Sequence, residues 1–126
     1  MPLISVVDDD IWVRESLDSL IRSVGMEVRA FASAEEFLGS AHACKADCLI
    51  LDVRLPGMSG IELHRHLLAG RCQVPVIFIT AHGSDEDARS AAASDWTAGY
   101  LIKPFSEDEL LDAINAALKL KTLPEA

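Results

Sequence analysis

The chain has 126 residues, of which half are hydrophobic and a quarter are charged, with only 7 glycines and 5 prolines. This length and composition fit one folded domain and exclude a disordered, collagen-like or disulfide-stapled mini-protein. The formal charge of −9 repels a phosphate backbone, so we expect no direct binding of nucleic acid by this domain.

Apolar runs alternate with helical patterns from the start of the chain. Leu3–Val7 is a short β-branched run that predicts a strand, and the apolar spacing after it predicts a helix that ends at Gly25. Met26–Phe31 predicts a second strand. The capping-box pattern that begins at Ser33 then predicts a short helix through about Gly39.

The same alternation continues in the middle of the chain. Cys48–Leu51 is a continuous apolar run that ends at Asp52, which is typical of a strand buried on both faces. A second capping box begins at Ser59 and predicts the next helix. Val74–Ile79 is another apolar strand, and it ends at Thr80.

The last third predicts one more polar helix, one strand and a final helix. An alanine-rich stretch over residues 84–94 favours the polar helix, and Tyr100–Ile102 predicts a short strand stopped by Pro104. A third capping box begins at Ser106 and opens a helix, after which the pattern is lost from Lys119. We expect one domain over residues 3–119, with residues 120–126 as a tail or the start of a linker.

Five successive β-α units with buried central strands predict a doubly wound α/β fold, with a parallel sheet and helices on both faces. Ligands of such sheets bind at the carboxyl ends of the strands, where the strand order switches. Polar residues follow the predicted strands at that edge: Asp8, Asp9, Asp10, Asp52, Thr80 and Lys103.

Three of these carboxylates, Asp8, Asp9 and Asp52, are expected to converge. At 4 Å, two like charges repel by about 1 kcal/mol in water and about 4 kcal/mol at an effective dielectric of 20. Oxygen ligands at such a site suit Mg²⁺ or Mn²⁺. With the Lys103 ammonium and the Thr80 hydroxyl, the set favours phosphoryl transfer through an aspartyl phosphate. Each of these residues alone is common at a strand end or a helix cap. Their joint occurrence at successive strand ends is what specifically indicates a phosphoryl-transfer site.

These residues stand in four motifs, and with them the chain resembles the receiver domain of two-component response regulators over about residues 3–118. The resemblance implies a CheY-like, flavodoxin-like (βα)5 sandwich with strand order 2-1-3-4-5. It also implies a phosphoacceptor rather than a classical enzyme, with Mg²⁺-dependent self-phosphorylation and intrinsic autodephosphorylation. The motifs are Val7-Asp8-Asp9-Asp10, the run Leu51 to Gly60 around Asp52, Ile79-Thr80-Ala81 and Lys103-Pro104-Phe105.

By this resemblance Asp52 is the phosphoacceptor. Asp9 and Asp52 bind Mg²⁺ directly, together with the backbone carbonyl of Arg54, and Asp8 holds the metal through water. Lys103 contacts the phosphoryl group. The family's lysine–proline bond is usually cis, which the motif suggests here.

Two further pairs take roles by the same resemblance. Thr80 and Tyr100 match the pair of residues that switch between two conformations. Arg54 and His82 match positions that tune dephosphorylation, and the alternative interpretation, that both are ordinary solvated loop side chains, has comparable weight. The chain between Thr80 and Lys103 is one residue longer than in FixJ-type chains.

The implied partner is a sensor histidine kinase, and the implied output is a change on the face of the fourth helix, fifth strand and fifth helix. A homodimer, if activation makes one, is expected there. The segment Ser33 to Phe37 and the motifs above are most similar to the FixJ-type branch, which usually carries a LuxR-type helix-turn-helix after its receiver. We expect DNA contact only through such a downstream domain. A stand-alone receiver and a phosphorylation-independent scaffold are the alternatives.

Other classes of protein fit less well. A haloacid-dehalogenase-type enzyme needs a second Asp two residues after its nucleophile, where this chain has Arg54. A flavodoxin-like FMN carrier needs a hydroxyl- and glycine-rich loop after the first strand, which here is acidic. The spacings of the His and Cys residues match no zinc ligand set.

The three cysteines, Cys44, Cys48 and Cys72, follow no CxxC spacing. We expect reduced thiols in a cytoplasmic protein, with at least two of the three in the core. No apolar run approaches the roughly 18 residues of a membrane span. No signal peptide is visible either, so no membrane contact is expected.

Overall fold

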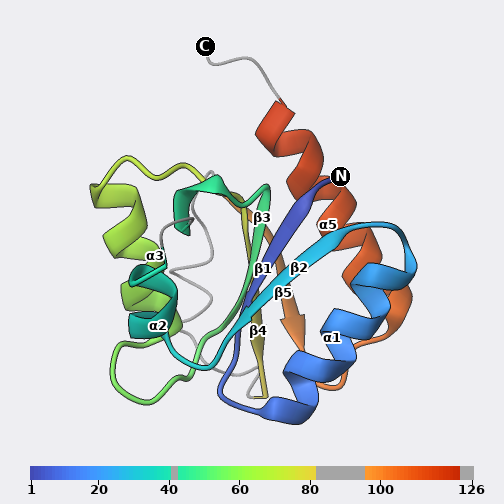
Figure 1. Ribbon diagram of the computed structural model, residues 1–126, viewed down its shortest axis with the longest axis horizontal. Coiled ribbons are helices and arrows are strands. Elements are labelled where there is room, and N and C mark those ends of the chain that lie inside the picture. The colour runs from blue at the N-terminus through green and yellow to red at the C-terminus, as the bar shows by residue number, and fades with distance from the viewer. Residues whose placement is uncertain (41–42, 82–95, 123–126) are drawn as a thin grey trace.

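The computed structural model describes residues 1–40, 43–81 and 96–122. Its centre is a parallel sheet of five strands in the order β2-β1-β3-β4-β5, which confirms the predicted strand order (Figure 1). The strands are β1 (Leu3–Val7), β2 (Glu27–Phe31), β3 (Cys48–Asp52), β4 (Val76–Thr80) and β5 (Thr97–Ile102).

Helices cover both faces of the sheet, as the doubly wound fold requires (Figure 1). One hydrophobic cluster packs α1 and α5 against one face, and a second packs α2 and α3 against the other. The helical elements are α1 (Ile11–Ser23), α2 (Ala34–Leu38), the 3₁₀ turn η1 (Ala43–Lys45), α3 (Gly60–Ala69) and α5 (Glu107–Thr122).

Strands β3 and β4 confirm the interpretation of continuous apolar runs as strands buried on both faces. All five residues of β3 and all five of β4 are buried. Because both strands have a neighbouring strand on each side and helices on both faces, the polar residues at their carboxyl ends, Asp52 and Thr80, are buried as well. The fold thus shields these two polar side chains from solvent.

All three predicted capping boxes begin helices. The hydroxyl oxygens of Ser33, Ser59 and Ser106 each accept a hydrogen bond from the backbone N–H three residues further on, at 3.0, 3.2 and 3.1 Å. In α5 the box is reciprocal, because the Glu109 carboxylate accepts from the N–H of Ser106. These local bonds fix where each helix begins, so the loops before them have defined ends.

The boundaries of α5 and β5 differ most from the prediction. Helix α5 continues to Thr122, past the expected loss of pattern at Lys119, because lysines in the last turn favour the helix and its dipole. Strand β5 begins at Thr97, before the expected Tyr100. The predicted helix over residues 84–94 lies outside the described residues.

The pairing of β4 with β5 is irregular at the start of β5. Val76 pairs with Thr97 and Ile77 with Gly99, so the register skips Ala98. Beyond this irregularity the two strands pair residue by residue to the end of β4. The carboxyl edge of the sheet is therefore in register despite this irregularity.

The cysteines correct one expectation. Cys44 and Cys72 form a disulfide across 28 residues of sequence, whereas three reduced thiols were expected. Their Cα atoms lie 5.5 Å apart because η1 and the turn after α3 meet at the amino edge of the sheet. Cys48 and Cys72 are buried, as expected of two of the three.

In the described ranges, no helix combines the length and apolar character that a bilayer crossing requires.

Candidate functional site

Three carboxylates converge at the carboxyl edge of the sheet. Asp8 and Asp9 directly follow β1, and Asp52 is the last residue of β3, the neighbouring strand. Each offers a ligand oxygen, and these oxygens all lie within 4.8 Å of one another. Asp8 is fully buried, Asp52 is 6% exposed and Asp9 is exposed. The cluster is therefore open to solvent on the side of Asp9.

Lys103, just after β5, reaches across the edge of the sheet to this cluster. Its Nζ lies 3.1 Å from Oδ2 of Asp8 and 3.1 Å from Oδ2 of Asp52. The peptide bond between Lys103 and Pro104 is cis, as the motif suggested. Lys103 thus brings one positive charge to a group of three carboxylates.

Backbone donors orient the two buried carboxylates. Oδ1 of Asp8 accepts from the N–H of Asp10 at 2.8 Å, and Oδ1 of Asp52 accepts from the N–H of Arg54 at 2.9 Å. Asp10 itself caps α1, accepting from the N–H of Trp12. Of the three acids after β1, this one has the structural role of a cap, and the other two form part of the cluster.

Burial dominates the electrostatics of the site. Burial raises the pKa of Asp52 above its ordinary value, the Arg54 N–H opposes this, and the charge of Asp8 raises it further. Burial alone lowers the pKa of Lys103, but its hydrogen bonds to Asp8 and Asp52 outweigh that effect and the pKa is raised. The site therefore keeps a lysine firmly charged beside a carboxylate that is costly to ionise.

The loop between β3 and α3 is held close to the acidic cluster. A Cβ added at Gly60 would lie 2.1 Å from the carbonyl oxygen of Asp52, so only glycine lets α3 begin this near the end of β3. The N–H of Gly60 also donates to the carbonyl of Val53 at 3.0 Å, which closes the loop. Arg54, which the resemblance names for its carbonyl, lies within this closed loop.

Two residues that sequence reasoning missed support the loops of the site. Nη1 of Arg14 donates to the carbonyl oxygen of Asp8 at 2.6 Å. Oε1 of Glu35, in α2, accepts from the N–H of Met58 at 3.2 Å, beside Gly57 with its positive φ of 76°. Arg14 stands in the first turns of the helix after the acidic motif, a position that could have suggested its role. No local signal indicates the contact of Glu35, because it joins residues 23 positions apart.

The expected switch residues lie on one face of the sheet. Phe78 pairs with Tyr100 and Thr80 with Ile102, so Tyr100 shares the face of Phe78 and Thr80. Thr80 is fully buried. The Tyr100 hydroxyl is buried and has no hydrogen-bond partner in the described part of the chain. His82, the expected tuning residue, lies outside the described residues.

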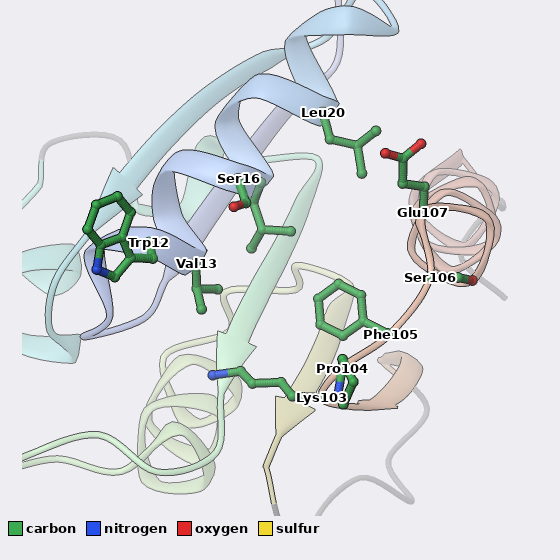
Figure 2. A pocket seen from close by; sticks show the side chains of 10 residues that line it. Trp12, Val13, Ser16, Leu20, Lys103, Pro104, Phe105, Ser106 and Glu107 are labelled. Carbon is green, nitrogen blue, oxygen red and sulfur yellow. The ribbon is translucent and has the colours of Figure 1, made fainter.

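An apolar pocket of about 390 Å³ adjoins the site, between α1 and the start of α5 (Figure 2). Figure 2 shows Phe105 in this pocket, opposite Val13 on α1, with Lys103 extending from the strand end. Trp12, at the rim, is 75% exposed. An apolar surface therefore lies directly beside the charged cluster.

Comparison with known proteins agrees with the motifs and the topology. The chain matches the response regulator receiver domain family over residues 4–115. It is 46% identical over 118 residues to the response regulator protein TodT of Pseudomonas putida, covering 94% of this chain and 52% of the relative. It is 35% identical over 116 residues to the transcriptional regulatory protein FixJ of Bradyrhizobium diazoefficiens, covering 92% of this chain and 56% of the relative.

A solved structure supports the same relationship. The response regulator StyR is 45% identical and superposes with a TM-score of 0.83, covering 95% of this chain and 60% of that chain. The chain thus spans about half the length of the curated relatives it matches. These relatives extend well beyond the region that they share with this chain.

Proposed function

Because this chain belongs to the response regulator receiver family and is a receiver domain of two-component signalling, we propose that Asp52 is its phosphoacceptor. The phosphoryl group comes from a sensor histidine kinase or from a small phosphodonor. The observation that carries the proposal is the convergence of Asp8, Asp9 and Asp52 around a space that Lys103 borders. No classical enzyme activity is required of such a domain.

The donor set fits a divalent cation. Asp9 and Asp52, with the carbonyl of Arg54, are the proposed direct ligands of Mg²⁺ or Mn²⁺, and Asp8 is the proposed water-mediated one. Hard carboxylate and carbonyl oxygens at an open site suit Mg²⁺, which keeps several waters and often bridges carboxylate to phosphate. Receiver domains typically bind Mg²⁺. When bound, the ion neutralises charge on the phosphoryl oxygens.

In the proposed reaction, a carboxylate oxygen of Asp52 attacks phosphorus in line with the bond to the donor. That bond breaks, and its electron pair leaves with the donor. Lys103, already 3.1 Å from both Asp8 and Asp52, neutralises a phosphoryl oxygen, while the backbone N–H of Arg54 holds the carboxylate in place. Hydrolysis of the aspartyl phosphate by water resets the domain, at a rate tuned by Arg54 and His82.

The switch follows from charge. The aspartyl phosphate carries one more negative charge than the carboxylate it replaces, so it attracts the Thr80 hydroxyl and Lys103. Movement of Thr80 vacates space that Tyr100, on the same face of the sheet, can fill. We propose that this changes the surface around β5 and α5, together with the predicted helix over residues 84–94, and that any homodimer uses this surface.

The kinase and the output domain are the proposed partners. The exposed Trp12 and the pocket beside Lys103 provide an apolar surface next to the phosphoacceptor, where a kinase helix can dock (Figure 2). The relatives TodT and FixJ are about twice as long as the matched region, and FixJ is a transcriptional regulatory protein. We therefore propose that this receiver controls an attached DNA-binding domain in the full-length protein.

The test is incubation with acetyl phosphate and Mg²⁺, followed by intact-mass measurement. The wild-type protein should gain the mass of one phosphoryl group, lost again on mild alkaline treatment, and Asp52→Asn should gain none. Asp18→Asn, at an exposed acid paired with Arg22 on α1, is the matched control and should be phosphorylated like the wild type. Labelling of Asp52→Asn would mean another acceptor, and an unlabelled wild type would favour a phosphorylation-independent scaffold.

A further inference from the structure

The disulfide between Cys44 and Cys72 joins two segments that the phosphoryl chemistry does not use. Cys44 lies in η1, before β3, and Cys72 lies in the turn between α3 and β4. Both segments are at the amino edge of the sheet, whereas Asp52 ends β3 at the carboxyl edge (Figure 1). The cysteines therefore lie outside the candidate site, although they flank it in sequence.

The two cysteines of the disulfide differ in their exposure to solvent. Cys44 is exposed, while Cys72 is 7% exposed and packs in the hydrophobic cluster beneath α2 and α3. A reagent in solution therefore reaches Cys44 first. The Cα separation of 5.5 Å lies within the range of about 4.4–6.8 Å that disulfides adopt, so the bond forms without moving the backbone.

The third cysteine, Cys48, does not react with the disulfide between Cys44 and Cys72. Cys48 is fully buried in β3, and burial raises the pKa of its thiol far above the ordinary value, with the charge of Asp47 adding to the effect. Since the thiolate is the nucleophile in thiol–disulfide exchange, Cys48 is inert in the folded protein. The chain thus offers one pairing, Cys44 with Cys72, and no alternative that would scramble it.

We propose that Cys44 and Cys72 form a reversible thiol modification site whose oxidant is a low-molecular-weight disulfide of the glutathione class. The Cys44 thiolate attacks this disulfide, breaking its S–S bond and releasing one thiolate to leave a mixed disulfide. The Cys72 thiolate then attacks the Cys44 sulfur and releases the second thiolate. The two leaving thiolates take up the two protons that the protein thiols lost, and the reagent gains the two electrons that the protein loses.

The disulfide closes a covalent loop that contains Asp52, the proposed phosphoacceptor. The residues between the two cysteines include all of β3, the loop with Arg54, and α3. Closing this loop lowers the entropy of the unfolded chain, so oxidation stabilises the fold. Since the bond lies at the opposite edge of the sheet from Asp52, it changes stability without touching the reacting groups.

The first experiment counts free thiols. The purified protein is equilibrated with oxidised glutathione or with dithiothreitol, unfolded in acid, alkylated with N-ethylmaleimide and weighed intact. We expect one alkylated cysteine, Cys48, after oxidation and three after reduction, with an internal Cys44–Cys72 peptide link in the oxidised sample. Three alkylated cysteines in both samples, or a disulfide between chains, would overturn the proposal.

The second experiment measures the thermal midpoint in both states. Oxidation should raise the midpoint of the wild type by about 10 °C. Cys44→Ser should melt like the reduced wild type in both buffers, whereas Cys48→Ala, at the cysteine that takes no part, should keep the full redox shift. An equal midpoint for the two wild-type states, or a redox shift that persists in Cys44→Ser, would contradict the proposal. Neither experiment depends on phosphorylation of Asp52.

Discussion

At the scale of single residues, the site combines charges of unequal burial. Asp8 and Asp52 are buried and share one lysine, whereas Asp9 faces solvent. In the absence of a cation, Lys103 offsets part of the repulsion among the carboxylates. A metal ion and this lysine therefore compete for the same negative charge, although the proposed phosphoryl transfer needs both.

Because of this competition, we expect Lys103→Met to increase the affinity for Mg²⁺ and to decrease the rate of phosphorylation. Mg²⁺ should bind more tightly, by roughly tenfold, because a positive charge about 3 Å from two carboxylates is removed from a partly solvated site. Phosphorylation of Asp52 by acetyl phosphate should nevertheless be slower. A titration of tryptophan fluorescence with Mg²⁺ and the rate of mass increase measure the two effects.

Lys45→Met is the matched control, because Lys45 is exposed at the amino edge of the sheet. It should change neither quantity. Weaker Mg²⁺ binding in Lys103→Met would show that the lysine positions the carboxylates more than it competes with the metal ion.

At the scale of secondary-structure elements, the beginning of α3 is fixed by a close backbone contact. The Cα of Gly60 faces the carbonyl of Asp52 with no space for a side chain, and the N–H of Gly60 bonds the carbonyl of Val53. The beginning of α3 and the end of β3 therefore form one rigid corner. Asp52, the proposed phosphoacceptor, lies on this corner.

Gly60→Ala should disturb this corner. The added Cβ would overlap a backbone atom, so α3 must shift, and we expect a loss of about 2–3 kcal/mol in the free energy of unfolding despite the higher helix propensity of alanine. Phosphorylation by acetyl phosphate should slow as well. Urea unfolding and intact-mass measurement check the two parts.

Gly70→Ala serves as the control at the other end of the same helix. A Cβ there would come no nearer than 3.5 Å to a neighbouring atom, and its φ of −85° suits any residue. Its stability should stay within about 0.5 kcal/mol of the wild type. If Gly60→Ala behaved the same way, the corner would be less rigid than its backbone contact implies.

At the scale of the whole molecule, the fold concentrates part of a formal charge of −9 in one place. The sheet brings together residues 44 positions apart, Asp8 and Asp52, and holds them in a buried environment. Folding without a cation thus works against electrostatic repulsion. Binding of a divalent cation by the folded state alone should relieve it.

Mg²⁺ should therefore raise the thermal midpoint. At about 100 times its dissociation constant, a ligand that binds only the folded state adds about 2.7 kcal/mol, which corresponds to a shift of roughly 10 °C. Asp9→Asn should lose most of this shift, and its midpoint without metal should equal or exceed that of the wild type because one repulsive charge is gone. Differential scanning fluorimetry with and without Mg²⁺ measures both. A shift of equal size in Asp9→Asn would exclude that carboxylate as a ligand.

Much of this protein was determined by local features of its sequence. The apolar runs of β3 and β4, the capping serines and the polar residues after each strand are readable because they depend on neighbours within a few positions. The parallel topology then follows from the alternation of strands and helices. It alone is enough to bring Asp8, Asp9, Asp52 and Lys103 to one edge of the sheet.

Only the tertiary structure decided contacts whose partners are distant in sequence and carry no shared pattern. The disulfide of Cys44 with Cys72, the bond from Met58 to Glu35 and the skipped register at Ala98 are of this kind. Each depends on how elements pack within a few ångströms, which hydrophobic periodicity leaves undetermined. The sequence alone therefore places the acidic site at the carboxyl edge of the sheet. Side-chain packing determines which residues support that edge and which two cysteines form the disulfide at the opposite edge.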